Sequence, residues 1–337
     1  MRSTSQTLMA VLLGLALVAW SGCGDSSDDG ETSSNAASNT TSSNSTGGTT
    51  GGTTSSNTSS TGGGGPCTSE PTGEAVDATR DGSCSAEYAY IAQVNGVVVD
   101  GDAASCVGAA KAQMCIRQVG GQLLCLRPED TNGTGQFSIP VPENARCMSS
   151  ATMRVLEPGA TRSTMYCHIE LPTDSTVLNL TETIPLFPTQ PASDLPPEGD
   201  ATAERTVTFP GGLEIDIVPD NLFDADYEDL AAGPVSEEGL CFVEGQGAVE
   251  QLYAFSPEGD VDGGGFKMRV PNSTGLAAGA KVDFHLLGGL SCTLSDGEAV
   301  EEGAWVQFDT GTVSGDGMFV ETDNGIPCLT WFGYSPQ

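Results

Sequence analysis

Hydrophobic and polar residues alternate in short runs along most of the chain after residue 67. This alternation is typical of β-strands that bury one face. Pairs such as Asp100-Gly101 and Asn132-Gly133, which favour turns, separate the runs. We therefore expect strands at 88–99, 113–119, 136–141, 152–156, 165–171 and 177–180. The Ala-rich stretch 103–112 is the one place in this series where a short helix is the alternative.

A stretch rich in proline and polar residues, 190–203, interrupts the pattern and is typical of a linker. A second series of alternating runs follows at 206–218, 241–244, 248–255, 265–270, 281–287, 305–308, 318–321 and 328–334. Strands at this spacing favour the β-sandwich. The sequence thus predicts an all-β protein with two β-sandwich domains, 67–189 and 204–337, joined by the linker 190–203.

The first 22 residues have the parts of an export signal: Arg2, the apolar run 8–20, and small residues at Ser21 and Gly22. The apolar run is shorter than the roughly 20 residues that a membrane-spanning helix needs. The segment Trp20-Ser21-Gly22-Cys23 resembles the lipobox of bacterial lipoproteins. That resemblance implies that residues 1–22 are a signal peptide and that Cys23 carries a lipid. The alternative is an ordinary secretory signal that leaves Cys23 as a free thiol.

Residues 24–65 consist of Ser, Thr, Gly, Asn, two Ala and a few acidic residues, without any aromatic or large aliphatic side chain. Such a tract cannot bury apolar surface, so we expect residues 23–66 to form a disordered tether. A tether between a lipid and a folded unit holds the unit clear of the membrane. We therefore expect the protein in the cell envelope, in the outer membrane or at the cell surface. Gly24, directly after the anchor cysteine, also points to the outer membrane.

The chain has 11 cysteines. If Cys23 is lipidated, an even set remains, which in an exported protein predicts five disulfides. The linker divides this set into seven and three, so at least one disulfide must cross it unless each part keeps a free thiol. A zinc site needs close C-x₂₋₄-C pairs, and the sequence contains none. The ten candidates are Cys67, Cys84, Cys106, Cys115, Cys125, Cys147, Cys167, Cys241, Cys292 and Cys328.

The formal net charge is −33, so the chain should repel nucleic acid. Calcium is the best cofactor candidate, because hard oxygen ligands on loops suit it. Asp260 and Asp262 are the candidate ligands, and 220–229 forms a second acidic cluster. Asp-Gly turns without a metal are the alternative.

The sequence contains none of the GxSxG, HExxH or P-loop motifs. His168 and Glu170 share one face of an expected strand, and His285 lies between two apolar residues, but no nucleophile is tied to them by spacing.

The aromatic residues that could form a glycan-binding face are Trp305, Trp331, Phe332 and Tyr334, for which core packing is the alternative. We therefore expect a non-enzymatic displayed structural or binding module; the alternatives are an adhesion or glycan-binding receptor and an extracytoplasmic enzyme of unrecognised type. The partner would be a protein or a glycan.

Three segments of the first part, 94–100 (VNGVVVD), 108–115 (GAAKAQMC) and 132–142 (NGTGQFSIPVP), resemble the carboxypeptidase-regulatory-like, transthyretin-like sandwich. The resemblance implies a β-sandwich that serves as a structural spacer in surface proteins. In the second part, 209–219 (FPGGLEIDIVP), 253–259 (YAFSPEG) and 266–271 (FKMRVP) are more weakly similar to ZU5-like β-modules. Neither resemblance implies an enzyme.

Overall fold

The computed structural model describes residues 66–337, apart from 74, 75, 77, 160, 161, 194, 237–239 and 243–248. The expected signal peptide, the anchor at Cys23 and almost all of the expected tether lie outside the described residues. The described residues are all-β, with short 3-10 turns and no α-helix among them. Within this part of the chain, no helix is long and apolar enough to cross a membrane.

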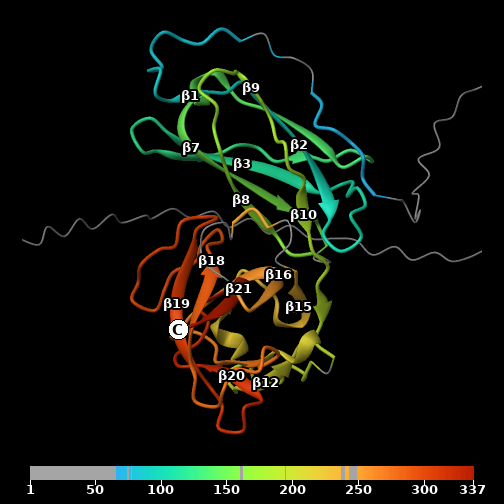
Figure 1. Cartoon of the computed structure of the whole chain (residues 1–337), viewed down its shortest axis with the longest axis vertical. Coiled ribbons are helices and arrows are strands. Elements are labelled where there is room, and N and C mark those ends of the chain that lie inside the picture. Colours follow the sequence, from blue (N-terminus) through green and yellow to red (C-terminus); the bar gives the residue numbers. More distant parts are fainter. Residues whose placement is uncertain are drawn as a thin grey trace, which may run out of the picture. The chain divides into compact units, whose positions relative to one another are not determined.

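The first block of the fold consists of two sheets (Figure 1). The larger has the order β1-β7-β3-β4, with β5 paired to β3 and β8 paired to β7. Its strands are β1 (Ala89–Tyr90), β3 (Lys111–Gln118), β4 (Leu123–Cys125), β5 (Glu129–Asp130), β7 (Cys147–Leu156) and β8 (Met165–Ile169). The smaller has the order β10-β2-β6, with β9 paired to β2; its strands are β2 (Gln93–Asp100), β6 (Gln136–Pro140), β9 (Val177–Asn179) and β10 (Ile184–Leu186).

A shared core joins these two sheets. Along β7 buried residues alternate with more exposed ones, as the sequence pattern predicts. Met114 and Met153 of the larger sheet lie in one apolar cluster with Val98 and Phe137 of the smaller. This packing of two sheets face to face confirms a β-sandwich for the first block. The alternative of a helix at 103–112 is wrong: residues 101–103 form a turn, and β3 begins at Lys111. A stretch of ten residues is too short for its alanines alone to stabilise a helix.

The second block is one sheet with the order β11-β15-β16-β21-β18-β19-β20-β17-β13-β12, and β14 paired to β16. Its strands are β11 (Gln190–Pro191), β12 (Arg205–Thr208), β13 (Glu214–Ile217), β14 (Leu222–Phe223), β15 (Ala231–Val235), β16 (Gln251–Val261), β17 (Met268–Pro271), β18 (Lys281–Leu287), β19 (Trp305–Val313), β20 (Phe319–Thr322) and β21 (Cys328–Pro336). The short strand β11 lies inside the expected linker 190–203, so the second sheet begins at Gln190, the first residue of that linker.

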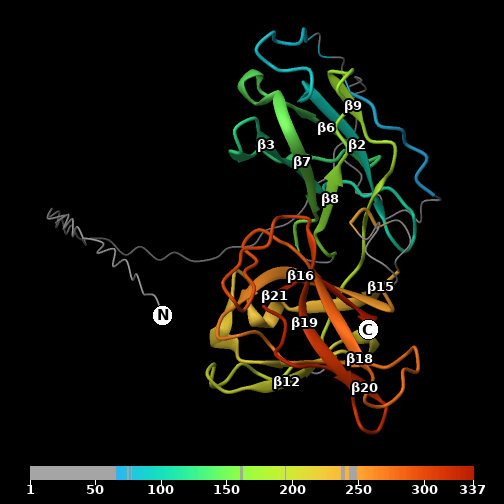
Figure 2. The ribbon, with the colours of Figure 1, turned by 60° about the vertical axis from the view of Figure 1, so that its left-hand side comes forward.

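This sheet curls so that β12, at one end, faces β15 and β16, near the other end, across a core (Figure 2). Phe209, beside β12, packs edge-on against Phe255 of β16, with ring centroids 6.0 Å apart. The hydroxyl of Tyr253 on β16 donates to the carbonyl of Gly211, in the 3-10 turn Pro210–Gly212. A single sheet that closes over itself in this way buries apolar residues of both ends, which gives the second block its sandwich-like core.

Five disulfides pair the ten predicted cysteines. They are Cys67–Cys106, Cys84–Cys147, Cys115–Cys125, Cys167–Cys241 and Cys292–Cys328. The pair Cys167–Cys241 joins β8 of the first block to the segment that follows β15 of the second. The prediction of a disulfide across the 190–203 boundary is therefore confirmed.

Apolar packing connects the same two blocks. Trp331 of β21 lies edge-on to Phe187, which follows β10, and its indole N–H donates to the carbonyl of Thr164 at 2.6 Å. Phe242, next to the cross-block disulfide, packs against both Trp331 and Trp305. These residues belong to the apolar cluster of the first block. The two blocks thus form one compact unit within 61–337.

Candidate functional site

A cavity of about 530 Å³ lies where the two blocks meet. One wall comes from the end of β7 and the segment before β8, and the other comes from β16, Asp224, the loop 289–291 and Thr330. Its charged lining residues are Arg154, Glu157, Arg162, Asp224, Glu258 and Asp260. The volume lies within the range of small-molecule sites.

An irregularity in β16 shapes one wall of the cavity. The register between β16 and β21 shifts between Ala254 and Gly259, and the Ser256–Pro257 peptide bond is cis. A bulge bends its strand and re-aims a side chain, which is why bulges are frequent next to functional sites. Here the irregular stretch carries Glu258, whose carboxylate reaches across to the first block.

Glu258 accepts a hydrogen bond of 2.7 Å from the hydroxyl of Tyr166, on β8. That hydroxyl also accepts a bond of 3.1 Å from Nε of Arg154, on β7. Burial and the Glu258 charge raise the pKa of Tyr166, which therefore stays a neutral donor. The other oxygen of Glu258, Oε1, is buried and has no hydrogen-bond partner.

Asp260, two residues further along β16, has a strongly perturbed carboxyl group. Burial, together with the charges of Asp224 and Glu258, raises its pKa to about 6. Asp224 follows β14, whose Phe223 is the register partner of Asp260. The pairing of β14 with β16 therefore brings two acidic stretches that are far apart in the sequence to the same cavity.

Of the two arginines on the opposite wall, Arg162 is already neutralised. Arg162 forms ion pairs with Asp100 at 2.8 Å and with Glu157 at 2.5 Å. Arg154 has a different position, with its guanidinium 5.9 Å from the Tyr166 ring centroid. The cavity thus carries a surplus of negative charge, with three carboxylates on the second-block wall.

The structure separates the two residues of the calcium prediction. Asp260 lines the cavity, whereas Asp262 lies beyond β16 in an exposed turn, where its carboxylate accepts the N–H of Gly263. Among the described residues, one group of three potential ligands lies within 4.8 Å, and it contains neither of them. Calcium at Asp260 and Asp262 stays a prediction, and Asp260 has Asp224 and Glu258 as its nearer charged neighbours.

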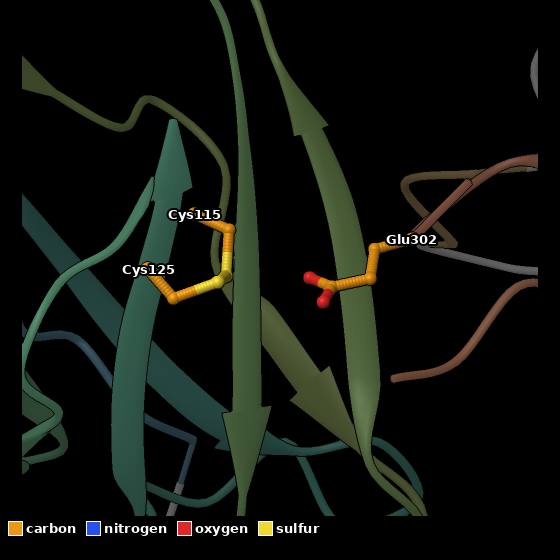
Figure 3. A group of neighbouring side chains, drawn as sticks. All are labelled: Cys115, Cys125 and Glu302. Carbon is orange, nitrogen blue, oxygen red and sulfur yellow. A yellow bond between two sulfur atoms is a disulfide. The ribbon is translucent and has the colours of Figure 1, made fainter. Parts of the chain in front are cut away.

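That group of three consists of Cys115, Cys125 and Glu302 (Figure 3). The two cysteines are register partners on β3 and β4 and form a disulfide. Disulfide sulfurs lack the thiolate that binds a metal. Glu302 points toward them from the second block, and burial raises the pKa of its carboxyl. The group is therefore a disulfide with a neighbouring carboxyl, and not a metal centre in the oxidised protein.

The two histidines lie in separate places. His168 is exposed on β8 and lines a second hollow of about 550 Å³ together with Glu170 and Glu182. His285 is half-buried on β18 and stacks on Trp305, with ring centroids 6.1 Å apart. Burial lowers the pKa of His285, and the charge of Asp283 opposes this. Phe284 and Leu286 on either side of it are fully buried, as the alternation predicts.

All four candidate aromatics are buried: Trp305, Trp331, Phe332 and Tyr334. Core packing is confirmed for them, so a glycan-binding platform built from these rings is wrong. They contact other rings within the two cores.

Sequence reasoning missed Arg154, Tyr166 and Glu258. The sequence signal for Glu258 was its place in Pro257-Glu258-Gly259 within a β-run, which is typical of a break in the strand. No such signal marks Arg154 or Tyr166, because their role depends on the contact between the two blocks. No protein-family model matches the chain, and a comparison with curated proteins finds no match.

Proposed function

We propose that this protein is a lipoprotein of the cell envelope, anchored through Cys23, whose β-unit is a displayed binding module without catalytic activity. The observation that carries the proposal is the cysteine pairing: the ten cysteines from Cys67 onward are all engaged in disulfides, so Cys23 alone lacks a partner among them. A lipid explains an odd cysteine at the end of an export signal.

The disulfide pattern also supports an oxidising compartment, because disulfides persist in the periplasm and at cell surfaces. The resemblance of the first block to transthyretin-like modules fits the observed packing of two sheets, and we assign this block the role of a structural support. The cavity between the blocks supports binding, since polar groups converge there on a concave surface.

Intact-mass analysis of the membrane fraction under non-reducing conditions tests the anchor. We expect a mass that corresponds to cleavage before Cys23, acylation of that cysteine and five disulfides. Cys23→Ser should move the protein to the soluble fraction, whereas the nearby Ser26→Ala should leave it in the membrane. An unmodified Cys23 thiol in the wild-type protein would refute the proposal.

A further inference from the structure

We propose that the cavity between the two blocks binds a small polyhydroxylated organic cation, of which an amino sugar is the simplest form. The inference rests on the binding half of the proposed function and does not depend on the lipid anchor.

The second-block wall presents three carboxylates with little compensation. Asp224 and Asp260 are not in any ion pair within the described part of the chain, and the partner of Glu258 across the cavity is the neutral hydroxyl of Tyr166. The raised pKa of Asp260 has the same physical origin, since its neighbours in the cavity are negative and burial removes water.

A positively charged donor would relieve this imbalance. A metal ion fits poorly, because Ca²⁺ needs several oxygens within about 2.3–2.6 Å of one point, and these carboxylates do not form a group within 4.8 Å. An ammonium group on a larger ligand needs only one or two of them, and the ligand's hydroxyls can reach the others.

The remaining lining groups suit hydroxyls. Ser256 and Ser291 line the cavity, as does Arg154. Leu290, about half exposed at 51 %, also lines it and offers an apolar contact for a ring face. Carboxylates for an ammonium, donors for hydroxyls and one apolar side chain together match an aminated saccharide.

Calorimetric titration of the full chain, purified from whole cells extracted with detergent, tests the proposal with glucosamine and N-acetylglucosamine. The two sugars differ in the ammonium charge, so we expect glucosamine to bind at least about tenfold more tightly. Equal affinities, or no binding of glucosamine, would overturn the proposal. Because this comparison needs no variant, it does not depend on the folding of a mutant.

Asp260→Asn should weaken glucosamine binding about tenfold or more, since it removes one partner of the ammonium. The matched control is Asp262→Asn, which removes the same charge two residues away but outside the cavity. Equal losses in both variants would show a diffuse attraction and would contradict a site. The mass of the same sample reports lipidation, so failure of the anchor and failure of the site are separate results.

Discussion

Tyr166 links three side chains at the junction between the two blocks. Its hydroxyl donates to Glu258 and accepts from Arg154, and the ring lies beneath the Arg154 guanidinium. A neutral tyrosine can serve both partners because its pKa is raised by burial and by Glu258. The hydroxyl therefore couples a strand of the first block to the irregular part of β16.

Tyr166→Phe should lower the free energy of unfolding by about 1.5–3 kcal/mol, because Glu258 loses its donor while it remains in the cavity wall. Urea denaturation at neutral pH measures the loss. Tyr88→Phe is the control; the hydroxyl of Tyr88 has no hydrogen bond among the described residues, so its removal should change stability by less than about 0.5 kcal/mol. Similar losses in both variants would contradict the bridging role of Tyr166.

Asp260 should make stability depend on pH. Its pKa is about 6 in the folded protein, against an ordinary 3.8. Between these values the folded state binds more protons than the unfolded state, so this group makes stability fall as pH rises through the window. Asp260→Asn should lack that fall and should be more stable than the wild type at neutral pH, by about 1 kcal/mol after solvent screening. Denaturation at a series of pH values measures the difference, and a constant difference between pH 3.8 and 6 would refute it.

At the scale of elements, the contact between β14 and β16 positions the acidic wall. A Cβ on Gly259 would lie 2.9 Å from Leu222 Cδ1 and 3.1 Å from the Phe223 carbonyl oxygen, both on β14. The absence of a side chain at Gly259 is what allows β14 to approach. Asp224 follows directly after this strand, so its position depends on the same contact.

Gly259→Ala should therefore push β14 away and cost about 1–3 kcal/mol of stability. Gly315→Ala is the matched control, because its Cβ would meet nothing within 4 Å. Thermal or urea unfolding measures both variants. If Gly259→Ala is as stable as Gly315→Ala, the close approach of β14 has no energetic weight.

The longer strands could be predicted from the sequence because each buries one face and so alternates. β18, at Lys281–Leu287, has the predicted bounds, and β7 and β19 are longer than predicted. β15 (Ala231–Val235) was missed because its Ala, Gly and Pro residues carry no alternation, and its first three positions are buried regardless. The predicted run at 241–244 begins with bends at Cys241 and Phe242, which are held by a disulfide and by ring packing and not by a ladder.

The acidic cavity could be predicted only in pieces. Asp260 and the cluster 220–229 both stood out in the sequence, as separate candidates. Their meeting depends on long-range pairing of β14 with β16, and the other wall depends on the packing of the first block. Local patterns do not specify contacts of this kind, because hydrophobic burial is non-directional.

At the scale of the whole molecule, the two blocks are held by both a covalent link and an apolar contact. The Cys167–Cys241 disulfide spans 74 residues of sequence, and Trp331 packs against Phe187 and Phe242 close to the same junction. The first restricts the unfolded chain, and the second removes apolar surface from water. Together they make independent motion of the blocks unfavourable.

Replacing both Cys167 and Cys241 by Ala should cost about 4 kcal/mol, compared with about 3 kcal/mol for replacing both Cys115 and Cys125, because the unfolded loop that is closed is much longer. We expect a single unfolding transition to remain in both variants, since the apolar contact still joins the blocks. Denaturation followed by tryptophan fluorescence and by circular dichroism measures this. Two separate transitions in the Cys167→Ala, Cys241→Ala protein would show that the disulfide alone couples the blocks.

The disulfide connectivity also determines how the chain must be made. Cys84 lies between the partners Cys67 and Cys106, and Cys106 in turn lies between Cys84 and Cys147, so these two bonds interlock along the sequence. A chain oxidised in the order in which it leaves a translocation channel would first join Cys67 to Cys84. That bond must then be broken by thiolate attack before Cys67 can pair with Cys106 and Cys84 with Cys147. If the chain is exported as proposed, we therefore expect its oxidation to need a disulfide isomerase, and a host without one should accumulate the peptide that links Cys67 to Cys84.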